Sequence, residues 1–283
     1  MLGISAIWLL GPADASAIVS CSYSAANPEA ATGNVVSIQG SQGSYNLPAL
    51  KRSGNTIEIV DAVLQQPVSC AGGTPTLTNT DTIALSSGTH TALTLDMREG
   101  AFEPGATDEG DGFSEIEFDL DWQGGFLNII GDLGGQRLSF AKVGSVSGLN
   151  FNPGLEPAEV DADLGEVAGV IVRGWAGTDV WDASGRFGFG KPFRRPVQFD
   201  ARGSFDGLYG GSADDLLEGG AGNDRIDGGR GNDTIKGGGR DDNITARDGD
   251  RDQIRCGSGK DRVEADLRDV VIACEVATGG ASD

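Results

Sequence analysis

The sequence has very little of what most catalytic and zinc-binding motifs require. Its 283 residues include one histidine, His90, which we expect at the surface. There is no H-E-x-x-H motif, no G-x-S-x-G nucleophile elbow and no C-x-x-C pair among the four cysteines. A Ser–His–Asp triad or a cysteine nucleophile would have to use His90. The sequence therefore argues against a zinc site and against these hydrolase mechanisms.

Positive charge is also scarce. The chain has 21 Lys and Arg against 42 Asp and Glu, a formal net charge of −21. Nucleic-acid binding requires a basic face, and anionic membrane surfaces attract basic segments, so neither partner is expected. The apolar run Leu2–Leu10 is too short to span a bilayer, and we expect no transmembrane segment in the mature chain.

Glycine and aspartate, by contrast, are abundant and periodic. Gly219–Asp227 reads GGAGNDRID and Gly228–Lys236 reads GGRGNDTIK. Looser copies precede them at Gly210–Glu218 and follow them at Gly237–Thr245. The template is G-G-x-G-x-D-x-U-x, where U is a large aliphatic residue. A disordered Gly/Asp-rich linker would not keep an aliphatic residue at every ninth position, so the period indicates a folded repeat.

Each position of the repeat has a physical role. The glycines allow a tight turn, and x-U-x forms a very short strand with U pointing inward. One unit buries too little apolar surface to fold alone, so units must stack. Two units make one coil of a flattened spiral, which places Asp215 over Asp233 and Asp224 over Asp242. Stacked carboxylates repel unless a divalent cation lies between them, and Ca²⁺ suits such flexible all-oxygen sites better than Mg²⁺.

The repeat resembles the RTX, or hemolysin-type, calcium-binding repeats of exported bacterial proteins. The resemblance implies an all-β fold, a right-handed parallel β-roll or β-solenoid with calcium in its turns, here preceded by a smaller β-rich N-terminal region. The nine-residue repeat continues beyond these copies but becomes less regular; the unit Ala246–Arg255, for example, has one extra residue. The candidate calcium ligands are Asp206, Gly211, Asp215, Gly219, Gly220, Gly222, Asp224, Gly228, Gly229, Gly231, Asp233, Gly237, Gly238, Asp242, Asp252 and Asp261.

A weaker rhythm precedes the clear repeats. Apolar i, i+2 pairs such as Leu127/Ile129 and Leu138/Phe140 recur about every ten residues from Ile116 to Phe199, with Gly-rich turns between them. We interpret them as ion-free coils of the same spiral; an ordinary β-sandwich joined to a repeat tail is the alternative. Further upstream, strand-like runs occur at Val35–Ile38, Ile57–Val60, Thr82–Leu85 and Leu93–Asp96.

These patterns divide the chain into five parts. We predict a signal peptide at 1–17, a β-rich N-terminal region at 18–109, degenerate coils at 110–200, the calcium-binding β-roll at 201–264 and a C-terminal cap with a tail at 265–283. The signal prediction rests on the early apolar run and on the A-x-A site at Ala15–Ala17, although no Lys or Arg precedes the run.

The four cysteines agree with export to an oxidising compartment. An even number in an exported chain suggests two disulfides, and local pairing gives Cys21–Cys70 and Cys256–Cys274. Each bridge would cap one end of the spiral, where the repeats are poorest.

The sequence thus predicts an extracellular or cell-surface calcium-binding protein with a structural or adhesive role, and with a surface glycan or protein as its partner. The alternatives are a glycan-binding module and a calcium-dependent polysaccharide lyase or epimerase. Such an enzyme needs carboxylates and basic groups in a groove, for which Asp119, Asp121, Lys142 and Arg173 supply only the residue types. An anionic protein suits an anionic polymer poorly unless calcium bridges them, and we expect no enzymatic activity.

Overall fold

The structure of the protein is a computed structural model. It describes residues 19–24, 35–39, 48–61, 66–77, 79–80, 82–86, 92–98, 117–121, 125–131, 137–143, 146–150, 162–164, 167–174, 177–186, 190–274 and 276–278. Every regular element in these ranges is a β-strand, which confirms the predicted all-β class. The proposed signal segment 1–17, His90 and the tail after residue 278 lie outside the described ranges.

The described strands form two sheets. In spatial order the first sheet consists of β1 (Ser20–Ser24), β2 (Val35–Gln39), β6 (Thr82–Ser86), β8 (Glu117–Asp121), β12 (Ala162–Asp163), β11 (Val146–Asn150), β10 (Arg137–Val143), β14 (Val180–Asp182), β17 (Gly207–Tyr209), β19 (Arg225–Asp227), β21 (Asn243–Ala246), β23 (Arg262–Ala265) and β25 (Val276–Thr278), with β15 (Lys191–Pro192) beside β10. The second consists of β24 (Val270–Ile272), β22 (Gln253–Ser258), β20 (Thr234–Gly239), β18 (Leu216–Ala221), β16 (Val197–Asp200), β13 (Gly169–Arg173), β9 (Phe126–Ile130), β7 (Ala92–Asp96), β3 (Pro48–Ser53), β4 (Thr56–Asp61) and β5 (Gln66–Val68).

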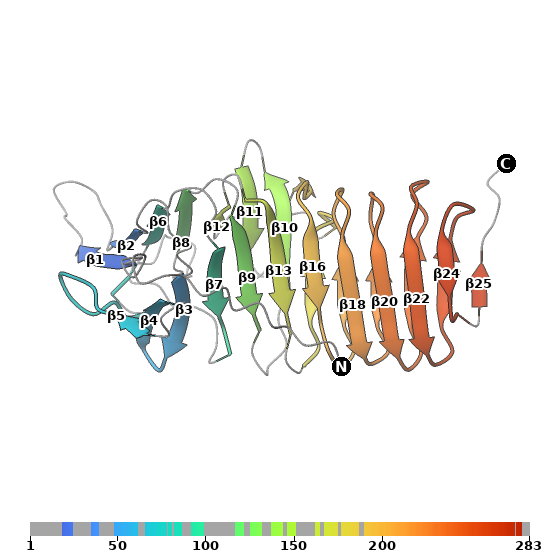
Figure 1. The fold of residues 1–283 in the computed structure, drawn as a ribbon, viewed down its shortest axis with the longest axis horizontal. Helices are drawn as coiled ribbons and strands as arrows, with labels where there is room; N and C mark the ends of the chain where they lie inside the picture. Colours follow the sequence, from blue (N-terminus) through green and yellow to red (C-terminus); the bar gives the residue numbers. More distant parts are fainter. Residues whose placement is uncertain are drawn as a thin grey trace, which may run out of the picture.

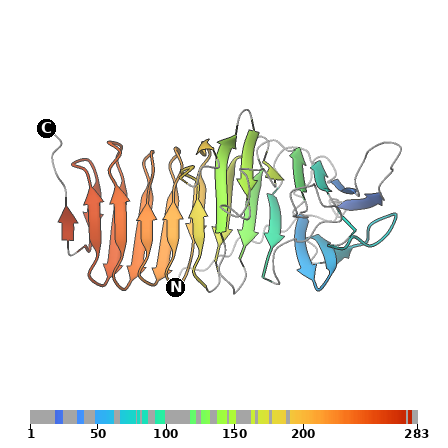
Figure 2. The same ribbon diagram turned by 180° about the vertical axis from the view of Figure 1, so that it is seen from behind.

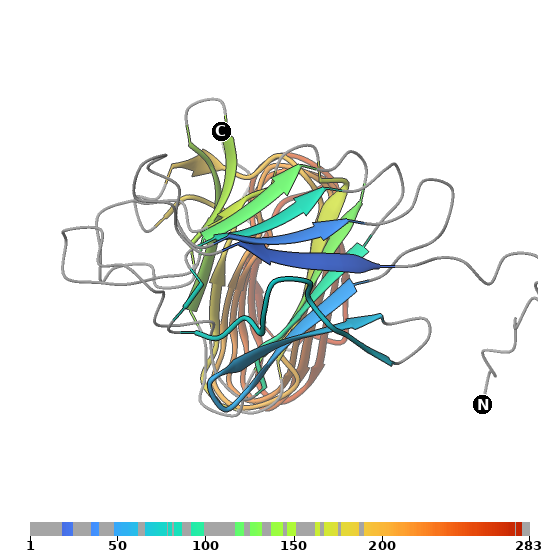
Figure 3. The same ribbon diagram turned by 90° about the vertical axis from the view of Figure 1, so that its left-hand side faces the viewer.

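The two sheets are the long sides of a flattened spiral. From β16 onward the chain alternates between the sheets, and every strand pairs in parallel with the strand one coil away. Figure 1 shows strands of the second sheet side by side along the long axis, and Figure 2 shows the molecule from behind. Seen from the end in Figure 3, the coils superpose as an elongated loop. This arrangement is the predicted parallel β-roll.

The aliphatic residue of each repeat points into the space between the sheets. One row of stacked residues is Leu208, Ile226, Ile244 and Val263 in the first sheet, and the other is Phe199, Leu217, Ile235 and Ile254 in the second. All of them are buried. Full burial of one such side chain contributes about 1.5–3 kcal/mol, too little to order nine residues alone, so the coils depend on stacking.

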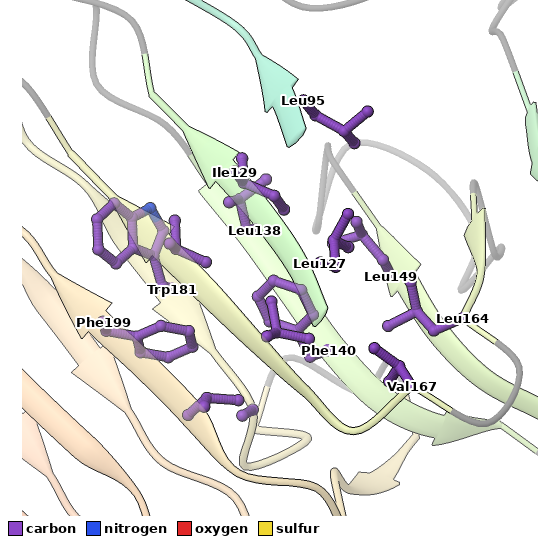
Figure 4. Packing of buried hydrophobic residues seen from close by; sticks show 14 of the residues in the cluster. Leu95, Leu127, Ile129, Leu138, Phe140, Leu149, Leu164, Val167, Trp181 and Phe199 are labelled. Carbon is purple, nitrogen blue, oxygen red and sulfur yellow. The ribbon is translucent and has the colours of Figure 1, made fainter. Parts of the chain in front are cut away.

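Aromatic side chains pack together in the core of the middle coils. Phe199 packs against Trp181 with ring centroids 5.6 Å apart and against Phe140 at 5.9 Å. Figure 4 shows these rings beside aliphatic residues such as Leu138 and Leu127 from neighbouring strands. One continuous hydrophobic core therefore joins the degenerate coils to the clear repeats.

Parallel stacking also extends upstream of residue 110, where we predicted that the spiral begins. β7 pairs in parallel with both β3 and β9, and β6 pairs in parallel with both β2 and β8. The four strand-like runs predicted upstream are strands β2, β4, β6 and β7. Short strands with alternating buried residues suit a solenoid coil even without Gly-rich turns. The five-part division itself stays a prediction.

One segment of the predicted spiral has a different topology. β10 and β11 pair antiparallel, with Phe140 opposite Leu149, and β11 also pairs antiparallel with β12. Only two residues separate β10 from β11, whereas a parallel connection needs a dozen or more. The apolar pair Leu138/Phe140 and the residue Leu149 that follows it in the ten-residue rhythm therefore do not mark two successive coils, as we had expected.

Disulfides lie near both ends of the described structure, with the pairing expected from the sequence. Cys21 is bonded to Cys70 and Cys256 to Cys274. Cys21 belongs to the edge strand β1, and Cys274 follows β24, the edge strand of the second sheet. Within the described ranges, no helix has the length and apolar character that a bilayer crossing requires.

Candidate calcium sites

The turns between strands bring the repeat aspartates into two stacks. The first Asp ladder precedes strands of the first sheet and consists of Asp179, Asp206, Asp224, Asp242 and Asp261. The second Asp ladder precedes strands of the second sheet and consists of Asp215, Asp233, Asp252 and Asp269. Members of a ladder are one coil apart, so the predicted stacking of Asp215 with Asp233 and of Asp224 with Asp242 is confirmed.

In each ladder residue after Asp179, one carboxylate oxygen accepts a hydrogen bond from the neighbouring coil. The backbone N–H of Asp206 donates to Oδ1 of Asp224 at 2.9 Å, and the N–H of Asp224 donates to Oδ1 of Asp242 at 2.8 Å. The same bond joins Asp215 to Asp233 at 2.8 Å and Asp233 to Asp252 at 2.8 Å. Each bond spans one coil, so the ladders are part of the stacking as well as of any ion site.

The second carboxylate oxygen is left buried and without a hydrogen-bond partner. This holds for Oδ2 of Asp206, Asp224, Asp233, Asp242 and Asp252, and all five residues are almost fully buried. An isolated buried carboxylate is expensive unless a cation or a proton neutralises it. These oxygens are therefore the best structural evidence for cation binding.

The unpartnered oxygens of Asp224, Asp233 and Asp242 lie close to the first glycine of their own turns. A Cβ built on Gly237 would lie 2.5 Å from Oδ2 of Asp242 and 2.6 Å from the carbonyl oxygen of Cys256, one coil away. A Cβ on Gly219 would lie 2.5 Å from Oδ2 of Asp224 and 2.8 Å from the carbonyl oxygen of Gly237. Glycine thus leaves room for a carboxylate and a carbonyl oxygen to approach one another, and such hard oxygen ligands suit Ca²⁺.

Glycine at the second position of the repeat is required for another reason. Gly220, Gly229 and Gly238 have φ of +103°, +91° and +118°, a region that residues with a Cβ rarely adopt. A Cβ on Gly220 would also collide with the carbonyl group of Arg202 in the coil below. These positions therefore set the turn path that aims the main-chain carbonyl groups.

Side chains alone do not complete a metal cage. Among the described residues, no three His, Cys, Asp or Glu side chains are grouped so that they could hold a metal ion. Calcium takes six to eight oxygen ligands, so the carbonyl groups of the turns would supply most of them. The residues present fit a site with both kinds of ligand, because carboxylate and carbonyl oxygens lie together at Gly219 and Gly237.

Burial controls the charge state of the ladders. Burial, opposed by the hydrogen bond from the Asp215 N–H, raises the pKa of Asp233 to about 8, and repulsion from Asp215 and Asp252 adds to the rise. Burial likewise raises the pKa of Asp206, Asp242 and Asp252 to about 7. Near neutral pH these carboxyl groups are therefore partly protonated, and a divalent cation would have to displace the protons in order to bind.

The predicted ligands all lie in or beside the turns, with one difference in secondary structure. Strands β18 and β20 continue through the glycine pairs Gly219/Gly220 and Gly237/Gly238, and Gly220 pairs with Gly238 across the sheet. Gly210/Gly211 and Gly228/Gly229 lie outside strands, as expected. The two sides of the spiral therefore have different turns, although the sequence template is the same.

Two aspartates extend the ladders without having been among the predicted ligands. Asp179 and Asp269 end the ladders: the N–H of Asp179 donates to Asp206 at 2.7 Å and the N–H of Asp252 donates to Asp269 at 3.0 Å. In the segment Gly174–Asp182, which reads GWAGTDVWD, Asp179 occupies the Asp position of the repeat template, so the template could have identified it.

Comparison with known proteins agrees with this geometry. Residues 206–244 and 227–263 match the family described as RTX calcium-binding nonapeptide repeat (4 copies). Searches of curated proteins and of solved structures gave no match. The matched segment contains the central members of both ladders. Residues 206–263 of this chain are therefore RTX calcium-binding nonapeptide repeats of the hemolysin type.

Proposed function

We propose that the chain is an exported protein whose β-roll is stabilised by calcium and which serves a structural or adhesive role at the cell surface. The observation that carries the proposal is the pair of Asp ladders with buried, unpartnered Oδ2 atoms. Calcium acts here as a structural ligand and not as a catalytic cofactor. It would neutralise repelling carboxylates that the fold otherwise holds close together.

Export is supported by independent features of the chain. RTX repeats are typical of secreted bacterial proteins, and the described structure has two disulfides, which persist in oxidising compartments. Extracellular calcium modules bind with dissociation constants near 10⁻⁴–10⁻³ M. A protein with such sites would remain unloaded where calcium is scarce and would become rigid after export.

The calcium role is tested with two variants of equal charge change. Asp224→Ala removes a central ladder carboxylate, and Asp241→Ala removes an exposed one from the neighbouring turn. Titration calorimetry should show fewer calcium ions bound by Asp224→Ala than by the parent chain, and an unchanged number for Asp241→Ala. Equal stoichiometry in all three proteins would contradict the assignment.

The candidate catalytic residues come from strands of both sheets. Asp119 and Asp121 lie in β8 and Lys142 in β10 of the first sheet, whereas Arg173 lies in β13 of the second sheet. This separation supports a role without catalysis. We expect no release of unsaturated or reducing ends when the calcium-loaded protein is incubated with acidic polysaccharides; turnover that depends on calcium would favour the lyase or epimerase.

A glycan-binding function has one specific observation in its favour. A shallow groove of about 290 Å³ on the second sheet is lined by Phe126, Pro196, Gln198, Asn232 and Thr234, among others. The Phe126 side chain is 46 % exposed. An exposed aromatic ring beside amide and hydroxyl groups suits a sugar ring. Binding on a glycan array that is lost in Phe126→Ala, with calcium binding unchanged, would establish this function.

A further inference from the structure

The last coil of the described structure presents apolar side chains to solvent. Of the five large hydrophobic side chains that are exposed in the described ranges, three lie close together in the sequence: Leu267, Val270 and Ile272. Val270 and Ile272 belong to β24, which is the edge strand of the second sheet (Figure 1). A free strand edge with exposed apolar side chains favours pairing with another chain, so this end of the spiral is a candidate interaction surface.

The edge strands at the opposite end of the molecule are protected against such pairing. The N–H of Tyr23 in β1 donates to the Ala71 carbonyl at 2.7 Å, and the N–H of Ala71 donates to the Cys21 carbonyl at 3.0 Å, so Ala71 occupies backbone groups of that edge. The edge strand β5 contains Pro67, which has no N–H to donate. β24 reads Val-Val-Ile and has neither form of protection among the described residues.

The backbone of β24 has one residue whose polar groups face the free edge. The N–H of Val270 donates to the Asp252 carbonyl at 2.9 Å, toward β22. Successive backbone N–H groups of a strand point to opposite sides, so the N–H and C=O of Val271 point away from β22. The Val271 side chain is turned inward and packs against the hydrophobic core. The edge therefore offers one donor and one acceptor on the same residue.

The last coil is electrically neutral, although the whole chain has a formal net charge of −21. Residues 253–274 contain four basic residues, Arg255, Lys260, Arg262 and Arg268, and four acidic residues, Asp261, Glu264, Asp266 and Asp269. Two copies of so acidic a protein repel one another over most of their surfaces. At this end the balanced charge allows a second copy to approach closely.

We propose that two copies of the chain associate through β24, antiparallel and about a two-fold axis at Val271, so that the second sheet continues from one copy into the other. The strand is self-complementary in this register. The two Val271 residues would exchange both N–H···O bonds, as the residues of a hydrogen-bonded antiparallel pair do. A second copy therefore satisfies the free donor and the free acceptor at once.

The same register covers the exposed side chains. Val270 of one copy lies opposite Ile272 of the second copy, and the reverse pair forms on the other side of the axis. Directly opposite β-branched side chains on one face of a sheet stabilise an antiparallel pair. Asp269 lies opposite Ala273, so no like charges face one another across the strands. The Cys256–Cys274 disulfide fixes this coil before the second copy binds.

The test is sedimentation of the full chain at saturating calcium, with Ile272→Lys and the matched control Thr234→Lys. Both variants add one positive charge to the second sheet, but Thr234 lies in β20, two strands from the edge. For the parent we expect a monomer–dimer equilibrium with a dissociation constant of about 10–100 μM, since small interfaces give weak complexes. Ile272→Lys should raise this constant by about tenfold or more, because a charge on an edge strand opposes pairing. Thr234→Lys should stay within about twofold of the parent.

Cross-linking with cysteine variants tests the register. Residues opposite one another in a non-hydrogen-bonded antiparallel pair have Cα atoms about 4.5 Å apart, which a disulfide can bridge. A mixture of Val270→Cys and Ile272→Cys chains should therefore form a covalent dimer under mild oxidation. Neither variant alone should do so, because position 270 lies opposite position 272 and not opposite itself. Cross-linking that is as efficient in either single variant as in the mixture would refute the register.

The sedimentation results decide whether the interface exists. A parent chain that stays monomeric up to about 1 mM would refute the proposal. A dimer that Ile272→Lys leaves intact, or that both Lys variants weaken equally, would also refute it, because the contact would then lie elsewhere or depend on charge alone. Assemblies that grow beyond the dimer would refute the two-fold arrangement, since each copy has one β24 edge. Circular dichroism at saturating calcium checks that each variant has folded.

Discussion

Glycine serves two different purposes in the turns, and only one of them concerns backbone conformation. At Gly220 and Gly238 a positive φ requires glycine. Gly237 has no such φ; glycine is needed there because two oxygens occupy the space of a side chain. Substitutions at the two kinds of position should therefore have different consequences for calcium binding.

The spatial requirement is tested by Gly237→Ala, with Gly239→Ala as its control. The added methyl group at position 237 would lie 2.5 Å from Oδ2 of Asp242 and 2.6 Å from the Cys256 carbonyl oxygen. We expect a loss of about 1–3 kcal/mol in the free energy of unfolding, typical of overpacking, together with weaker calcium binding. A Cβ on Gly239 comes no closer than 3.5 Å to Ser258 Oγ, so that variant should unfold like the parent. Equal stability of the two variants in denaturant titrations would contradict this account.

The raised pKa values of the ladder residues make the calcium-free protein sensitive to pH. Because burial raises the pKa of Asp233 to about 8 and that of Asp242 to about 7, the folded state holds protons that the unfolded state releases. This stabilisation is complete below the ordinary Asp pKa and is lost as pH rises through 7–8. In chelator, the melting temperature should fall between pH 6 and pH 8, and the gain on adding calcium should be larger at pH 8. A calcium-free protein that melts at a higher temperature at pH 8 than at pH 6 would contradict the predicted direction of this pH dependence.

At the scale of strands and turns, the sequence determines the repeats well because each position is constrained by stacking. The inward residues Ile226 and Ile244 and the ladder residues Asp224 and Asp242 recur in a fixed register, so both the strands and the candidate ligands could be predicted. The hairpin β10–β11 could not, because an i, i+2 apolar pair is the same in parallel and antiparallel strands.

The last coil depends on its disulfide more than the coils before it. Cys256–Cys274 closes a loop with a sequence separation of 18, which contributes about 3 kcal/mol in the chain-entropy model. Apolar side chains of the coil that it closes are in contact with solvent: Leu267 is 84 % exposed and Ile272 is 48 % exposed. Reduction should therefore release β24 and β25 before the other strands. Hydrogen exchange on the reduced protein should show lost protection at Val270–Ile272 first; simultaneous loss in β18 would contradict this order.

At the scale of the whole molecule, the protein is a row of coils in which each coil contacts its neighbours. Stability in such a row is the sum of contributions from coils and from the contacts between them, and the ends need caps. Here the disulfides lie near the two ends, while the Asp ladders run through the last third of the chain. The net charge of −21 adds a general repulsion that calcium would reduce. Calcium should therefore stabilise the C-terminal part of the spiral most.

Thermal unfolding of the purified chain in calcium and in chelator tests the central claim most directly. Each site that is bound in the folded state alone adds about 2.7 kcal/mol at a calcium concentration 100 times its dissociation constant. With several sites in the ladders, 10 mM calcium should raise the melting temperature markedly and increase the β signal in circular dichroism, and magnesium at the same concentration should do much less. Superimposable melting curves in calcium and in chelator would contradict the account.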